Sequence, residues 1–216
     1  MKITPQKMSS FKNKKNKTKL DDFWMESVLG KGTYAKVYLV KHKSTEKLYA
    51  LKVLKKRKFL TQKNIKLILR ERNLLITLKK HPFLVQFYAA FQSEDKLFFL
   101  IEYCPGGELF NLLHKRKRLS FIEAKFYSAQ ILLALEYLHN KNFIYRDLKP
   151  ENILIDATGY IKLTDFGLSR EISEEKIYSL CGTVEYLSPE SFTKSGYGKE
   201  VDWWAFGILL YEMVVG

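Results

Sequence analysis

The amino-acid sequence predicts an α+β fold built from two successive parts. Residues 23–102 contain five short segments rich in β-branched and aromatic residues, with turn-like breaks between them and one helical pattern between the third and the fourth. Residues 103–216 contain mainly helical patterns. We therefore expect an antiparallel five-stranded sheet with one inserted helix, followed by a mainly helical part.

The strands of the first part are expected at residues 23–29, 36–40, 48–54, 84–91 and 97–101. Segments of this length and composition suit a pleated, half-buried sheet. The inserted helix is expected over residues 61–78, where apolar residues recur at mixed steps of three and four without an intervening Pro or Gly. This spacing gathers the apolar side chains on one face of the helix.

The second part begins after a Pro-Gly-Gly turn at residues 105–107. A short helix is expected at 108–114, and Ser120 with Glu123 three residues later forms a capping box that opens a longer helix, with its apolar run over 126–138. Two short strands are expected near 153–155 and 160–163, joined by a turn. An apolar helix over 201–215 ends the chain.

The charge of the chain is strongly positive and uneven. Its 216 residues are 46% hydrophobic and 14% aromatic, which is enough for a large core and excludes a wholly disordered chain. The formal net charge is +14, and residues 1–22 alone hold seven Lys against two Asp. We expect residues 1–22 to be a basic, disordered tail. The positive balance fits nucleic acid, an anionic membrane or phosphate-bearing ligands without choosing among them.

The two cysteines, Cys104 and Cys181, lie far apart and outside any Cys/His cluster, so neither a structural zinc site nor a disulfide framework is expected. A polar, Lys-rich N-terminus gives no secretory signal. The longest apolar stretch, at 203–215, is too short for a membrane span and contains Glu212. We expect a soluble cytoplasmic protein, with the nucleus open as a second location.

A glycine hairpin is expected between the first two strands. Residues 30–37 read GKGTYAKV, and glycines such as Gly30 and Gly32 let backbone N–H groups approach an anionic ligand closely. An ordinary hairpin with no ligand explains this segment equally well when it is taken alone. It is not a P-loop, because no GxxxxGK[ST] pattern occurs.

Lys52 lies in the apolar third strand, where its ammonium group is costly to bury without an anionic partner. Glu71, on the helix that follows, could be that partner. An edge-strand Lys and a surface Glu are an equally good interpretation of these two residues alone.

The most specific segment reads YRDLKPEN at residues 145–152 and is followed by DFG at 165–167. Asn152 and Asp165 carry the oxygen ligands that suit Mg²⁺. Asp147 could accept or orient the proton of an attacking hydroxyl, and Lys149 could neutralise charge on a transferring group. A polar loop could explain any one of these residues, but not the whole set at this spacing.

This ordered set of motifs resembles a eukaryotic Ser/Thr protein kinase over nearly all of residues 23–216. Tyr145 before Arg146, the segment LCGTVEYLSPE at 180–190 and VDWW at 201–204 are similar to the AGC group, which includes the cAMP-dependent kinase catalytic subunit and the S6 and Akt-type kinases. The resemblance implies a two-lobed kinase-like fold, with an N-lobe at 23–102 and a C-lobe at 103–216.

The resemblance also implies binding of ATP and Mg²⁺. It assigns Asp147, Lys149 and Asn152 to catalysis, and Asn152 and Asp165 to the metal. The residues that it assigns to the nucleotide are Gly30, Gly32, Val37, Ala50, Lys52, Glu71, Glu102, Cys104, Glu108 and Leu154. It further implies that Tyr145 and Phe166 belong to a stacked hydrophobic column anchored by Asp202.

Regulation and substrate choice follow from the same resemblance. Ser179 matches an activation-loop phosphorylation site, which implies an upstream kinase, and its phosphate would meet Arg146 and Arg170. Thr183 is expected to contact the catalytic Asp and Lys. The acidic residues Glu108, Glu151 and Glu212 match positions that bind arginines of the substrate, so protein substrates with basic residues near the target Ser/Thr are expected.

The chain also departs from the family pattern. Ala35 replaces the third glycine of the phosphate loop, and we expect slower nucleotide handling from it. The C-lobe stops after its central helix, so we expect a fragment of a longer kinase that is inactive or folds poorly alone. Two other functions are kept open: a truncated pseudokinase-like nucleotide-binding or scaffold protein, and a nucleic-acid-binding protein driven by charge. The second lacks any recognised reader motif, so no sequence-specific nucleic-acid partner is expected.

Overall fold

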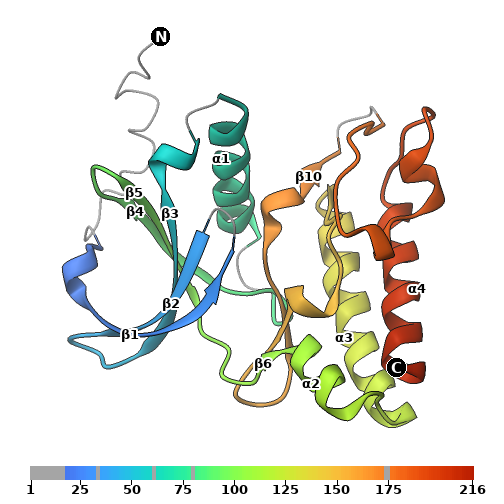
Figure 1. The fold of residues 1–216 in the computed structure, drawn as a ribbon, viewed down its shortest axis with the longest axis horizontal. Coiled ribbons are helices and arrows are strands. Elements are labelled where there is room, and N and C mark those ends of the chain that lie inside the picture. Colours follow the sequence, from blue (N-terminus) through green and yellow to red (C-terminus); the bar gives the residue numbers. More distant parts are fainter. Residues whose placement is uncertain (1–17, 33–34, 60–61, 79–80, 173–175) are drawn as a thin grey trace. The chain divides into compact units, whose positions relative to one another are not determined.

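The computed structural model describes residues 18–32, 35–59, 62–78, 81–172 and 176–216 (Figure 1). These residues form two compact units. The first unit comprises the described residues up to Arg72 together with Gln86–Tyr103, and the second comprises Asn73–Val85 and Cys104–Gly216. The change from one unit to the other at 103/104 lies next to the boundary expected at 102/103.

The first unit is built on a five-stranded antiparallel sheet, as the sequence predicted. Its strands follow the order β1-β2-β3-β5-β4, in which only β4 and β5 depart from sequence order. The strands are β1 (Phe23–Lys31), β2 (Ala35–His42), β3 (Leu48–Lys55), β4 (Phe87–Gln92) and β5 (Lys96–Glu102). On one face, Val40, Leu51, Phe98 and Leu100 pack with Phe23 into a buried core.

The inserted helix α1 (Gln62–Thr77) lies between β3 and β4 in the chain, as expected. Residue 61, the expected first position, lies outside the described residues. The described residues of α1 up to Arg72 belong to the first unit, and those from Asn73 belong to the second. A 3₁₀ turn, Leu20–Asp22, precedes β1, so the last residues of the tail expected at 1–22 are structured, while residues 1–17 lie outside the described residues.

The strand expected at 84–91 is wrong at its start. The strand β4 begins only at Phe87, because Leu84 and Val85 pair elsewhere. Leu84 forms a parallel bridge with Leu163, and the Val85 amide donates to the Leu163 carbonyl at 2.9 Å, within the second unit. The apolar composition of these residues is that of a strand, but their partner is the edge of another sheet.

Besides the end of α1, the described residues of the second unit form the helices α2 (Leu109–Arg116), α3 (Phe121–Asn140) and α4 (Glu200–Val215). Figure 1 shows α3 and α4 lying side by side. The capping box is present: the Ser120 hydroxyl accepts from the Glu123 amide, and the Glu123 carboxylate accepts from the Ser120 amide. This pair satisfies backbone donors that have no partner inside the helix.

Small sheets complete the second unit. The expected hairpin forms from β8 (Ile153–Ile155) and β9 (Ile161–Leu163), and β6 (Gly107–Glu108) adds a third strand that was not predicted. Glu108 is therefore in a strand, not at the start of the expected helix, which begins at Leu109. A second unpredicted pair joins β7 (Phe143–Ile144) to β10 (Arg170–Glu171). Two-residue strands carry no periodicity that a sequence could reveal.

None of the helices in the part of the chain that the structure describes is long and apolar enough to cross a membrane. Both cysteines are free thiols, with Cys104 buried and Cys181 half-buried.

Candidate active site

In the first unit, Lys52 and Glu71 form the ion pair that the sequence left open. The Lys52 ammonium nitrogen lies 2.6 Å from Glu71 Oε1, and the two side chains are only 16% and 8% exposed. Because both groups are largely removed from water, each charge would be costly to bury if the other were absent. The surface interpretation of these two residues is therefore excluded.

The strand register aligns the nucleotide residues expected in the first unit. Gly30 pairs with Val37, and Val37 pairs with Lys52, so these three form one row across β1, β2 and β3. Ala50, two residues before Lys52, lies on the same face of β3 because side chains alternate along a strand. The Glu102 carboxylate accepts from the Gln86 amide at 3.0 Å at the end of β5.

In the second unit, Glu108 and Leu154 are cross-strand partners between β6 and β8. The Cys104 carbonyl accepts from the Gly107 amide at 3.3 Å, which closes the turn that leads into β6. A Cβ atom at Gly106 would lie 2.8 Å from Ile155, so this turn requires glycine. Cys104, Glu108 and Leu154 are thus brought together by one small sheet.

The loop that carries Asp147 is anchored to the start of α4. The buried Asp202 carboxylate accepts from the Tyr145 and Arg146 amides, both at 2.8 Å, and pairs with His139 Nε2 at 2.8 Å. Arg146 has a φ of 68°, a conformation that L-residues seldom adopt. A strained backbone conformation persists only where the surrounding structure holds it in place. Here the two hydrogen bonds from the Tyr145 and Arg146 amides to Asp202 hold the loop.

Three polar side chains, from Thr183, Lys149 and Asn152, converge on Asp147. Thr183 donates to Asp147 Oδ1 at 3.0 Å and accepts from Lys149 at 2.8 Å, while Lys149 lies 3.4 Å from Asp147 Oδ2. Asn152 Nδ2 donates to both Asp147 Oδ2 and the Asp147 carbonyl at 2.8 Å. The carboxylate is therefore held in one orientation beside a lysine charge, which suits a group that must receive or orient a proton.

Asn152 and Asp165 fit a magnesium site in their chemistry and in their position. Asn152 directly precedes β8 and Asp165 follows β9, so both lie at the same end of the antiparallel hairpin, where the Thr164 amide donates to the Asn152 carbonyl at 3.0 Å. Because Asn152 Nδ2 points at Asp147, its amide oxygen points away and can serve as a ligand. A carboxylate and an amide oxygen are the donors that this hard cation prefers.

Tyr145 and Phe166 stack edge to face with ring centroids 5.6 Å apart, and both are fully or almost fully buried. The Tyr145 hydroxyl donates to the Thr164 carbonyl. Burial, followed by the nearby charges of Asp165 and Asp147, raises the pKa of Tyr145 well above its ordinary value. This tyrosine therefore stays neutral and ties the Asp147 loop to the segment that carries Asp165.

Ser179 lies beside Arg146 in the segment that precedes α4. Arg146 Nη1 donates to the Ser179 hydroxyl at 3.0 Å and to the Tyr197 hydroxyl at 3.1 Å, and Tyr197 in turn donates to the Ser179 carbonyl at 2.6 Å. Arg170 lies on β10 and makes no hydrogen bond or ion pair with Ser179 among the described residues. Its contact with a phosphate at Ser179 stays a prediction.

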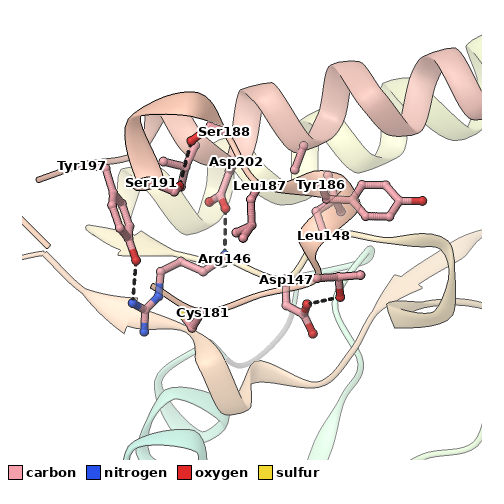
Figure 2. A pocket seen from close by; sticks show the side chains of 13 residues that line it. Arg146, Asp147, Leu148, Cys181, Tyr186, Leu187, Ser188, Ser191, Tyr197 and Asp202 are labelled. Atoms are coloured by element: carbon pink, nitrogen blue, oxygen red, sulfur yellow. Dashed lines mark hydrogen bonds between the residues drawn. The ribbon is translucent and has the colours of Figure 1, made fainter. Parts of the chain in front are cut away.

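A pocket lies between the Asp147 loop and α4, and Figure 2 shows Arg146, Asp147, Cys181, Tyr197 and Asp202 around it. On one side the chain approaches the Arg146 carbonyl so closely that a Cβ atom at Gly182 would lie 2.7 Å from it. Gly182 also has a φ of 112°, so only glycine fits there without strain. This contact fixes the segment from Ser179 to Thr183 against the catalytic loop.

The three predicted acidic residues lie in an electrostatically coupled group. Burial, and then the charge of Glu151, raises the pKa of Glu108. Glu212 accepts a hydrogen bond from the Tyr186 hydroxyl, whose pKa is raised by burial and by this bond, with a further contribution from Glu151. A bound cation reduces the electrostatic repulsion between neighbouring carboxylates.

Sequence reasoning missed Tyr197 and Tyr186. Tyr186 lies inside the segment LCGTVEYLSPE, but that pattern gave it no role of its own. Each tyrosine acquires a role only through a partner distant in sequence: Arg146 for Tyr197 and Glu212 for Tyr186. His139 was missed as well, since its spacing in α3 indicates only a buried helix position.

The fold and these contacts define a protein kinase domain, and the chain belongs to the protein kinase domain family, whose pattern matches residues 23–216. The chain is 50% identical over 202 residues to the serine/threonine-protein kinase Sgk1 of Gallus gallus, covering 92% of this chain and 46% of that protein. It is 48% identical over 198 residues to sgk-1 of Caenorhabditis elegans, covering 91% and 43%.

The chain is also 48% identical to the cAMP-dependent protein kinase catalytic subunit of Dictyostelium discoideum, over 92% of this chain and 30% of that protein. The resemblance to the AGC group is thereby confirmed. The chain spans less than half the length of each of these relatives.

Proposed function

We propose that this chain is the catalytic part of a Ser/Thr protein kinase, which transfers the γ-phosphoryl group of ATP to Ser or Thr hydroxyls of proteins. The observation that carries the proposal is the hydrogen-bonded group of Asp147, Lys149, Asn152 and Thr183 on a loop anchored by Asp202. This is a preorganised proton acceptor next to a fixed positive charge, as phosphoryl transfer requires.

Each of these residues has a defined task in the proposed reaction. Asp147 orients the substrate hydroxyl and accepts its proton, and Lys149 compensates negative charge on the transferring group. Asn152 and Asp165 hold Mg²⁺, while Lys52, kept in place by Glu71, binds the nucleotide phosphates. When bound, ATP supplies the phosphoryl group and Mg²⁺ reduces its negative charge.

The proposed substrates carry Arg or Lys near the target residue. The support is the acidic group of Glu108, Glu151 and Glu212: the charge of Glu151 acts on the half-buried Glu108, which favours a bound cation, and Glu151 and Glu212 both act on Tyr186. Although the whole chain has a net charge of +14, carboxylates at contact distance outweigh distant charges that are screened by salt.

We further propose that phosphorylation of Ser179 by an upstream kinase activates the protein. Ser179 is exposed, so another enzyme can reach it, and Arg146 already points at its hydroxyl. A phosphate there would form charge-assisted hydrogen bonds with Arg146 and strengthen the link to the catalytic loop. A cytoplasmic location stays a prediction.

The test is transfer of labelled γ-phosphate to an Arg-rich peptide in the presence of Mg²⁺. Against the expectation that the 216 residues alone are inactive, the proposal predicts transfer by the unaltered chain, a loss of roughly 1000-fold or more in Asp147→Asn, and no change in Asp21→Asn, an exposed control. A peptide with Glu in place of Arg should react far more slowly. Binding of ATP without transfer by the unaltered chain would favour a nucleotide-binding scaffold instead.

A further inference from the structure

A short segment of chain joins α2 to α3 (Figure 1). The side chains in and beside this segment form an exposed surface that the proposed catalytic function does not use. We call this surface the α2–α3 patch, which consists of Lys115, Lys117, Arg118, Phe121, Ile122 and Lys125. All six side chains are exposed, and they fall within eleven consecutive residues.

The apolar part of the patch is unusually open to solvent. Phe121 is 77% exposed and Ile122 is 80% exposed, which makes them the two most exposed large hydrophobic residues in the described part of the chain. They occupy the first turn of α3, whose buried face uses other residues, including Ala124, Ile131 and Leu135. The fold of this helix therefore does not explain why two large apolar side chains project into water.

The basic residues of the patch lie on both sides of this apolar pair in the sequence. Lys115, Lys117, Arg118 and Lys125 form no ion pair or side-chain hydrogen bond with any described residue. Lys125 follows Phe121 by one helical turn, so the two share a side of α3.

The charge of Glu123, the acidic residue within this stretch, is already balanced by an arginine outside the patch. Glu123 is bound to Arg116, with a shortest contact of 2.5 Å. Hydrogen bonds from Ser120 and then from Arg116 lower the pKa of Glu123 to about 2. Glu123 therefore stays charged at neutral pH and balances Arg116, which leaves the four cations of the patch uncompensated.

We infer that the α2–α3 patch binds an anionic lipid surface, with Phe121 and Ile122 entering the headgroup region and the four cations meeting lipid phosphates and carboxylates. Clustered Lys and Arg are attracted to anionic leaflets, and apolar side chains beside them add binding by leaving water. Nucleic acid would bind the four cations, but contact with it would add little binding free energy from the aliphatic Ile122. Phe121 and Ile122 project into solvent from the start of α3 and do not line a groove. This arrangement suits insertion into a lipid headgroup region better than docking of a partner protein into a pocket.

The test is sedimentation of the 216-residue chain with vesicles of phosphatidylcholine alone or with added phosphatidylserine, at about 0.15 M salt. We expect binding only to the vesicles that contain phosphatidylserine. The double variant Lys115→Glu/Lys125→Glu should lose about tenfold or more in affinity. The matched variant Lys43→Glu/Lys47→Glu changes the charge equally at exposed positions of the first unit and should change affinity much less.

A second pair of variants isolates the apolar contribution. Phe121→Ala/Ile122→Ala keeps every charge and should weaken binding about tenfold, whereas Val28→Ala/Leu48→Ala, at exposed positions of the first unit, should not. Equal losses in both charge variants would show attraction to the whole basic chain and overturn the inference. Unchanged binding in the Phe121/Ile122 variant would overturn it too. Neither readout depends on phosphoryl transfer, so the outcome is separate from that of the proposed function.

Discussion

The Asp202 carboxylate accepts a hydrogen bond from the Arg146 amide at 2.8 Å, across 56 residues of sequence. Arg146 has a φ of 68° at this point, and the neighbouring Tyr145 amide donates to the other oxygen of Asp202. The helix α4 thus imposes a strained backbone conformation on the loop that presents Asp147 (Figure 2). An acid far from the reacting groups in sequence sets their geometry.

Asp202→Asn should lower the free energy of unfolding of the second unit by about 3 kcal/mol, because an amide retains only one acceptor oxygen for three buried donors. Urea denaturation followed by the fluorescence of Trp203 and Trp204, which adjoin Asp202, measures this change. Asp21→Asn is the exposed control and should stay within about 0.5 kcal/mol. An equally small effect for Asp202→Asn would mean that the loop holds its conformation unaided.

Lys52→Met should destabilise the first unit by about 3 kcal/mol, since it leaves the Glu71 carboxylate buried without its cation. Adding Glu71→Leu should restore much of the melting temperature, because no charge then remains buried. Both variants should fail to bind nucleotide, because both lack the Lys52 ammonium group. If the double variant melted as low as Lys52→Met, burial of the unpaired Glu71 charge would not be the cause.

Thr183→Val keeps the shape of the side chain and removes the hydroxyl that joins Lys149 to Asp147. We expect kcat for peptide phosphorylation to fall ~10- to 100-fold, since one donor and one acceptor lose their partner. Thr183→Ser retains the hydroxyl and should keep most of the activity. Steady-state kinetics compares the two, and equal kcat values would argue against a role for the hydroxyl.

Tyr197→Phe removes the hydroxyl that donates to the Ser179 carbonyl and accepts from Arg146. We expect the activity gained on phosphorylation of Ser179 to shrink severalfold, because Arg146 is no longer held toward that residue. Activity before phosphorylation should change less. The ratio of the two activities is the measured quantity, and the same ratio in Tyr178→Phe, an exposed neighbour, serves as the reference.

Binding of a basic peptide should weaken as the pH falls through the raised pKa of Glu108, since protonation removes its charge. The stability effect has the opposite sign: a raised folded-state pKa gives stability that is present below the ordinary value of 4.5 and lost as the pH rises through the folded-state value. Glu108→Gln should therefore melt higher than the unaltered chain at pH 8 while binding the peptide more weakly. Peptide titrations and melting curves from pH 5 to 8 test both effects.

Local patterns predicted much of the fold. The individual strands of the sheet, the inserted helix and the capping box of Ser120 with Glu123 are all present, because each depends on residues close together in sequence; the pairing of β3 with β5 does not. The strand at 84–91 failed at its start for the opposite reason. The partner of Leu84 is Leu163, and no local pattern reports a contact across almost eighty residues.

The residues of the candidate site likewise fall into those that the sequence predicted and those that only the structure revealed. Motifs singled out Asp147, Lys149, Asn152 and Asp165, because phosphoryl transfer needs these residue types at set spacings. Tyr197 and His139 carried no such signal. Their roles arise only where Arg146 and Asp202, respectively, come within hydrogen-bonding distance.

By itself, the sequence determined the family and predicted the five-stranded sheet, the inserted helix and the longer helices, but not the two-residue strands β6, β7 and β10. It also named the residue types of the candidate site. It left open whether Lys52 and Glu71 pair, and what the excess of positive charge is for. The tertiary structure decided the first point with a largely buried 2.6 Å contact. It also left Phe121 and Ile122 exposed, in a stretch whose four cations Lys115, Lys117, Arg118 and Lys125 form no ion pair with any described residue. The physical reason is that burial and ion pairing depend on distances between residues far apart in the chain, which only the folded backbone fixes.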